Sequence, residues 1–134
     1  MGVTITNREL LNITTDTSGD ASVTSEGLVM GLVDMCDIVV PASGGIADAA
    51  VTISIVKSDG TAGPTILAVT GISASASYHP RAALSTTAGV ALIFATNHPI
   101  VTEIPAAAGD KLKVVVSGGG SVLKAQVYVV IKGE

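Results

Sequence analysis

Charged and aromatic side chains are what this sequence has least of. Charged residues make up 13% of the 134 residues, about half of the roughly 25% that is typical of soluble domains. Aromatic residues make up 2%, and there is no tryptophan. The seven basic residues are scattered and the formal net charge is −4. The chain therefore lacks the basic patch and stacking aromatics of nucleic-acid binders, and we expect no nucleic-acid partner.

Cysteine and histidine are also scarce, which restricts the chemistry that the chain can perform. The single cysteine, Cys36, excludes a disulfide within the chain. Its neighbours Asp34 and Asp37 are possible ligands, but a metal site needs three or four, and His79 and His98 lie far along the chain. Strand alternation would place Asp34 and Cys36 on one face. We expect Cys36 to be a small buried side chain, with no metal and no cofactor.

Signatures of catalysis and of membrane insertion are missing as well. The sequence has no G-x-S-x-G elbow, and the glycines at 118–120 are not followed by the G-K-[ST] of a phosphate-binding loop. The apolar run around Phe94 is interrupted by polar residues and falls short of the roughly 20 apolar residues that span a bilayer. The opening MGVTITNREL does not resemble a signal peptide. We expect no catalytic residues, no enzyme activity and no membrane partner.

Alternation of apolar and polar residues is abundant, and it predicts β-strands. It is clear in the runs AVTISIVKSDG (50–60), DKLKVVVSGGG (110–120) and VLKAQVYVVIK (122–132). The last run is apolar on both faces, so we expect that strand to be covered on both sides. Further strands are expected at 3–6, 12–15, 21–25, 28–39, 64–71, 71–77, 90–96 and 100–104.

Turn residues recur roughly every 8 to 12 residues, the spacing of an all-β sandwich or barrel. We predict one domain spanning 1–134, with residues 1–20 as a candidate extended N-terminal arm. The best helix candidate is NRELLN (7–12), one or two turns long. A jelly-roll-like β-sandwich is the first choice of fold. An immunoglobulin-like sandwich is the alternative, although its Cys, Trp and Cys pattern is absent.

The segment 60–102 contains a single charged residue, Arg81. Interface cores are depleted in Lys, Glu and Asp and enriched in Tyr, Phe and Arg. The segment holds Tyr78, His79, Arg81 and Phe94, and we predict these four as protein-interface residues. Pro80 restricts the backbone of His79, so the segment would lose little entropy on binding. The alternative is a loop made soluble by Ser and Thr, in which Arg81 merely meets solvent.

The runs YHPRAALSTTAGVALIF and EIPAAAGDKLKVVVSGGG give the chain a resemblance to the capsid decoration, or cement, proteins of tailed bacteriophages. The resemblance extends over about 27–131 and has no diagnostic motif. It implies a jelly roll or a related β-sandwich that binds the outside of the virion, bridges neighbouring major capsid proteins and stabilises the shell without enzyme activity. It also implies a dimer or trimer of this chain, made in the host cytoplasm.

A carbohydrate-binding or adhesin-type β-sandwich is the competing class. Such sites usually stack aromatic rings on sugars, and this chain has two tyrosines and one phenylalanine. The scarcity of rings makes this the second choice.

Overall fold

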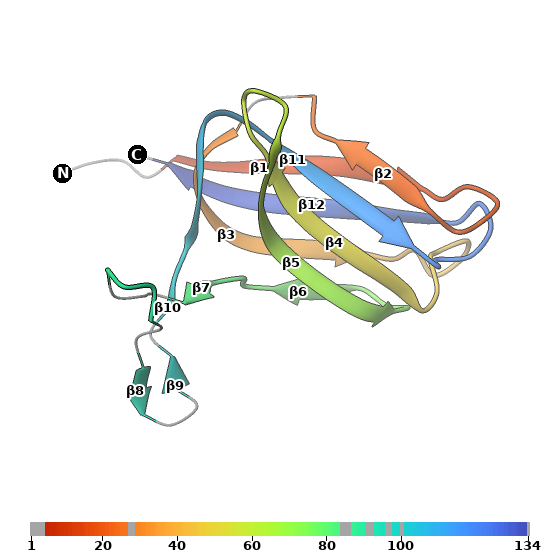
Figure 1. The fold of residues 1–134 in the computed structure, drawn as a ribbon. Helices are drawn as coiled ribbons and strands as arrows, with labels where there is room; N and C mark the ends of the chain where they lie inside the picture. The colour runs from red at the N-terminus through yellow and green to blue at the C-terminus, as the bar shows by residue number, and fades with distance from the viewer. Residues whose placement is uncertain are drawn as a thin grey trace.

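The computed structural model describes residues 5–26, 29–83, 87–90, 93–95, 98–99 and 101–133, and these contain strands and no helix. Figure 1 shows two layers of strands packed face to face. The strands are β1 (Ile5–Thr14), β2 (Ala21–Thr24), β3 (Val29–Val39), β4 (Ala49–Val56), β5 (Ala62–Ile72), β6 (Ala76–Tyr78), β7 (Ala82–Ala83), β8 (Ile93–Ala95), β9 (His98–Pro99), β10 (Val101–Thr102), β11 (Ile104–Ser117) and β12 (Lys124–Gly133).

Eight strands build two antiparallel sheets. Sheet A runs β1-β12-β3-β6, and sheet B runs β2-β11-β4-β5. Counted along the chain, the first of these eight strands pairs with the last, the second with the seventh, the third with the sixth and the fourth with the fifth. One long antiparallel hairpin has therefore been wrapped into two sheets, which is the jelly-roll arrangement. The jelly-roll prediction is confirmed.

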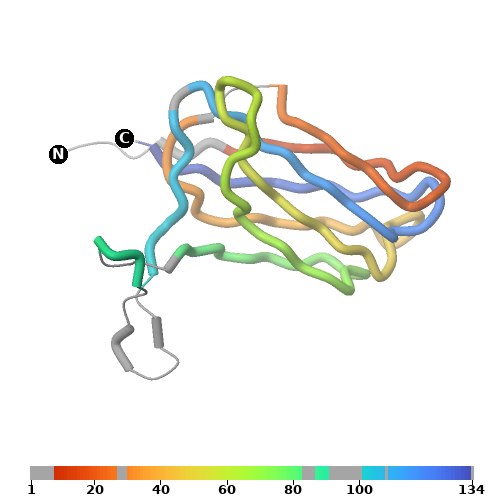
Figure 2. The backbone as a smooth tube through the Cα atoms, in the orientation of Figure 1, coloured from red at the N-terminus to blue at the C-terminus, as the bar shows by residue number. Residues whose placement is uncertain are grey.

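Strand β11 belongs to both sheets. Its first part pairs with β3 in sheet A, and the register shifts between Ala106 and Asp110. The second part, from Lys111, pairs with β4 and β2 in sheet B. Figure 2 traces this passage of the chain from one layer to the other. Such irregularities let a strand bend and change sheets.

The core lies between the two sheets and follows the predicted alternation. Strand β4 alternates buried and half-buried residues along its whole length, and so does most of β12. The outer face of β12 is half-exposed, so the prediction that this strand is covered on both sides is wrong: a two-layer sandwich has no third layer. The largest fully buried side chains are Leu11, Ile13, Ile38, Ile46, Ile53, Ile55, Leu112 and Ile131.

Residues 7–12 are not a helix, and the chain from Ile5 to Thr14 is not a free arm. This segment is strand β1, whose residues pair with β12 from Ile5 opposite Gly133 to Thr14 opposite Lys124. Leu11 and Ile13 point into the core, while Leu10 is 43% exposed. The outward Leu10 beside the inward Leu11 hides the period of two in the sequence, which explains the mistaken helix.

Between β6 and β11 the chain leaves the two sheets. β7 and β10 pair with each other, with Ala82 opposite Thr102 and Ala83 opposite Val101. β8 and β9 form another short antiparallel pair. Figure 1 places β7 and β10 beyond one end of the sandwich. We call residues 79–83 and 101–104 the stem, because the chain departs and returns through them.

Candidate functional site

A β-bulge in β3 creates the candidate site. Met35 lies opposite Val130 and Val33 lies opposite Ile131, so Asp34 is an extra residue with no partner on β12. Both Val33 and Cys36 are consequently buried. Asp34 is turned outward, and the prediction that Asp34 and Cys36 share a face is wrong. Bulges are known to re-aim side chains in this way.

Gly31 allows β3 to approach β12 closely just before the bulge. Its φ is +133°, a conformation that side chains with a Cβ rarely adopt. A Cβ at this position would lie 2.2 Å from the carbonyl oxygen of Lys132. Glycine is therefore required here for the backbone that presents Asp34 and Lys132 side by side.

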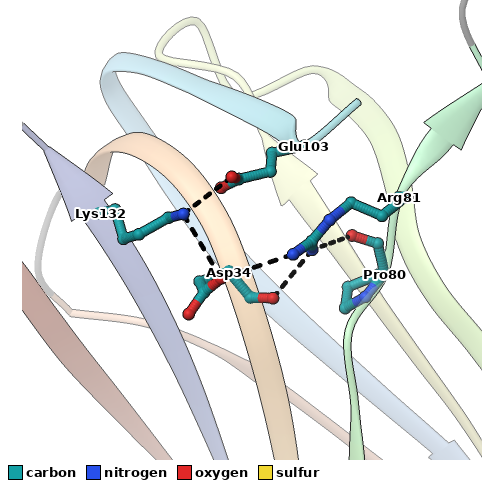
Figure 3. Close-up of polar contacts among 5 residues, drawn as sticks. All are labelled: Asp34, Pro80, Arg81, Glu103 and Lys132. Carbon is teal, nitrogen blue, oxygen red and sulfur yellow. Dashed lines mark hydrogen bonds and ion pairs between the residues drawn. The ribbon is translucent and has the colours of Figure 1, made fainter. Parts of the chain in front are cut away.

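Arg81 reaches from the stem to this bulge, as Figure 3 shows. Its Nη1 donates hydrogen bonds to the carbonyl oxygen of Asp34 at 2.9 Å and to that of Pro80 at 2.8 Å. Its Nη2 lies 3.5 Å from the Oδ1 of Asp34, and 27% of the side chain is exposed. The guanidinium is thus bound within its own chain.

Lys132 joins the other side of the stem to the same carboxylate. Its Nζ lies 2.8 Å from the Oε1 of Glu103 and 3.5 Å from the Oδ1 of Asp34. The hydrogen bond to Glu103, with the negative charges of Glu103 and Asp34, raises the pKa of Lys132 above its usual value. We call Asp34, Arg81, Glu103 and Lys132 the Asp34 cluster.

The Asp34 cluster is suited to holding backbone segments together. Its two positive and two negative groups neutralise one another, and they come from β3, β12 and both sides of the stem. Over the described part of the chain, no group of three or more His, Cys, Asp or Glu is arranged as metal ligands would be. We therefore interpret the cluster as a positioning device.

Cys36 is buried inside sheet A and faces the core, as predicted. Burial, with a smaller contribution from the negative charge of Asp37, raises the pKa of its thiol to about 12. Since the thiolate is the reactive form, a thiol in this environment is inert at neutral pH.

A second polar row crosses the outer face of sheet A. Arg8 lies over the ring of Tyr128, 4.4 Å from its centroid, and its Nη2 lies 3.4 Å from the Oδ2 of Asp37. The hydroxyl of Ser77 donates a hydrogen bond to the same carboxylate. These side chains come from all four strands of sheet A, so they tie its outer surface together.

The predicted interface residues have different environments. Tyr78 of β6 lies opposite Cys36 of β3. It is half-buried and packs against the core. His79 is exposed, and Arg81 belongs to the Asp34 cluster. Phe94 is in β8, but its side chain lies outside the described residues. The prediction that these four residues bind another protein stays a prediction.

The sequence reading missed Glu103 and Lys132. One signal was available, because Arg81 and Glu103 are consecutive charged residues with none between them. Charged residues on both sides of a long uncharged segment are candidates for ion pairs that hold the two ends of the segment together. Their partners Asp34 and Lys132 are distant in sequence, and no local pattern indicates them.

Two strands along one side of the sandwich are built from uncharged residues, although the exposed Asp48 lies next to them, with its backbone N–H donating to the hydroxyl of Ser73. The edge strands of the two sheets there are β5 and β6, and neither carries a charged residue. Arg81 is the only charged residue from 60 to 102, and its guanidinium is bound to Asp34 and Pro80. We call β5, β6 and the connecting residues 73–75 the uncharged edge. Figure 1 shows the two strands along the same side of the molecule.

Comparisons with known proteins leave the function open. No protein-family model matches the chain, and no curated protein matches it. Among solved structures, the chain is similar to the crystal structure of FlhE, with 15% sequence identity, a TM-score of 0.42, and coverage of 94% of this chain and 96% of that chain. A likeness of this degree carries no argument. In the part of the chain that the structure describes, no helix is long and apolar enough to cross a membrane. The fold defines the chain as a jelly-roll β-sandwich.

Proposed function

We propose that this chain is a non-enzymatic structural protein that decorates the outside of a bacteriophage capsid and bridges neighbouring major capsid proteins. The resemblance in sequence suggests this role, and the jelly roll is one of the β-sandwich folds that the resemblance implied. The proposal depends most on one observation, the uncharged edge.

An uncharged edge strand exposed to water can pair with the edge strands of other protein chains and cause aggregation. Natural edge strands are usually blunted by Lys, by proline or by bulges, because their free backbone groups can pair with other chains. β5 contains Pro64 and pairs with β4 through several register shifts, which limits open-ended pairing. It contains no charged residue to oppose burial. Such an edge is suited to burial against a defined partner surface.

Apolar side chains near the stem add to the surface that a partner could cover. Val101 in β10 is 48% exposed, and Leu32 of β3, which pairs with Pro105 just after the stem, is 43% exposed. Each contact of this kind is weak, but many copies on one lattice would bind strongly through multivalency. Decoration of a capsid fits these properties, because the apolar surface would be covered in the assembly.

The carbohydrate-binding alternative receives less support from the aromatic residues. Tyr78 packs against the core, and Arg8 already covers a face of the Tyr128 ring. A sugar would need a free ring face for stacking. These contacts reduce the ring surface that either tyrosine could offer to a sugar.

The experiment is to mix the purified protein with capsids assembled from the major capsid protein that is encoded near its gene. The proposal predicts saturable co-sedimentation with the capsids at micromolar concentration, and capsids that resist heat better when they are decorated. Failure to bind such capsids at any tested ratio would contradict it. Sedimentation of the protein alone tests the expected dimer or trimer separately, and a monomer of 13.3 kDa would remove that part of the proposal.

A further inference from the structure

Both sides of the stem end on the Asp34 cluster. Arg81 immediately precedes β7, and Glu103 immediately follows β10. Arg81 binds Asp34 of β3, and Glu103 binds Lys132 of β12. The contact between Lys132 and Asp34 joins the two halves, as the dashed lines in Figure 3 show. The departing and returning chain are thus fastened to sheet A through one set of four side chains.

We propose that the Asp34 cluster is an electrostatic clasp, which holds the stem closed against sheet A and can open while the jelly roll stays folded. The closed form is the one that the structure describes. Opening breaks the contacts of Arg81 with Asp34 and of Glu103 with Lys132, and it frees the β7–β10 pair. This inference goes beyond capsid binding and concerns the isolated protein.

Partial exposure makes the clasp sensitive to its surroundings. The exposed fraction of the four side chains ranges from 24% for Glu103 to 34% for Lys132. Ions in solution reach such pairs and weaken their attraction. The core between the sheets is apolar and fully buried, so salt does not weaken it in the same way. Salt should therefore loosen the stem and leave the core unchanged.

One unsatisfied group lowers the stability of the closed clasp. The Oε2 of Glu103 is buried and has no hydrogen-bond partner among the described residues. A buried carboxylate oxygen without a donor has lost its hydration without compensation. Opening returns this oxygen to water, which offsets part of the loss of the Lys132 contact. The clasp consequently holds the stem with little excess stability.

Beyond Pro80 and Ile104, which are buried where the stem meets the sandwich, two short strands give the stem little other support. β7 and β10 have two residues each and pair with each other in a sheet of their own. Segments with few buried apolar contacts open locally at a lower free energy than the core. Loss of the clasp should therefore be detected at β7 and β10 before it is detected in the sandwich.

The test is amide hydrogen exchange, measured by NMR for Ala82, Ala83, Val101 and Thr102, at low salt and at about 1 M NaCl. The clasp predicts faster exchange of the wild-type stem in salt, with core amides of β4 and β11 unaffected. Asp34→Asn removes the two 3.5 Å contacts of the Asp34 carboxylate and should speed exchange of the stem at low salt several-fold. The Lys132–Glu103 pair remains in this variant, so part of the salt dependence should remain. Arg8→Gln is the matched control, because it breaks the Arg8–Asp37 pair on the same sheet and leaves the cluster intact.

Two results would overturn the clasp. One is stem exchange that is the same in Asp34→Asn and wild type and insensitive to salt, which would mean that other contacts hold the stem. The other is an equal rise in the core amides, which would make the cluster part of global stability. If Asp34→Asn does not fold, Lys132→Gln replaces it. Lys124→Gln then serves as the control on the same strand, since no ion pair of Lys124 is found among the described residues.

Discussion

The guanidinium of Arg81 donates a hydrogen bond to the main-chain carbonyl oxygen of Asp34 at 2.9 Å, across 47 positions of sequence. The only charged residue from 60 to 102 is therefore bound to the sandwich itself. Arg81 fastens the stem to β3, so it would shape a partner surface at the stem only indirectly. Its guanidinium already donates hydrogen bonds to the carbonyl oxygens of Asp34 and Pro80, so Arg81 is a poorer direct anchor for a partner than the sequence suggested.

Gly31 should be among the least replaceable residues of the fold. Gly31→Ala should lower the free energy of unfolding by on the order of 3 kcal/mol, because the new Cβ meets the Lys132 carbonyl and φ is +133°. Gly60→Ala is the control, with φ +86° and nothing within 4 Å, and should cost only about 1 kcal/mol. Urea unfolding measures both. Equal losses would show that the close approach at Gly31 is not important.

The buried thiol of Cys36 should make the fold sensitive to alkali. Its pKa is raised to about 12 in the folded chain from about 9 when exposed. The unfolded chain therefore loses this proton first, and stability falls as pH rises from about 9 towards 12. Cys36→Ala should remove this part of the slope in unfolding measured between pH 8 and 11. A slope that is unchanged in the variant would contradict the buried, neutral thiol.

Substitution of Cys36 by serine tests its packing role separately. Cys36→Ser should preserve the fold and cost about 1–3 kcal/mol, because a hydroxyl replaces a thiol in an apolar site. A thiol reagent should label the native protein only after unfolding. Rapid labelling of the folded protein at neutral pH would show that the sulfur is accessible.

Deprotonation of Lys132 should weaken the attachment of the stem at alkaline pH. Its pKa is raised by Glu103 and Asp34, so its stabilising contribution is complete below about pH 10.5 and is lost as pH rises through the raised value. Lys132→Gln should flatten the dependence of stem hydrogen exchange on pH in that range, after correction for intrinsic exchange. Lys124→Gln should not. The same dependence in both variants would count against the Lys132 contacts.

Much of the fold was predictable, because buried and more exposed residues alternate along its central strands. Val114 and Val127 lie inside, as the alternation of their strands predicted. The bulge at Asp34 was not predictable in this way, because one extra residue reverses the faces that alternation assigns. Scarcity of charge drew attention to Arg81, whose contacts in the structure lie within the chain. Its partner could not be identified, because sequence alone does not show which distant strands meet.

The most direct test of the proposed docking surface places one charge on the uncharged edge. Ala68 is exposed on β5, at the edge of sheet B, and Thr24 is exposed on β2, at the opposite edge. Burial of an unpaired charge in an interface costs several kcal/mol. Each variant, Ala68→Lys and Thr24→Lys, is added to undecorated capsids, and its occupancy is compared with that of wild type after thermal unfolding has verified its fold. We predict that Ala68→Lys loses at least tenfold in affinity and that Thr24→Lys binds as wild type does. Full occupancy by a correctly folded Ala68→Lys would contradict docking through the uncharged edge.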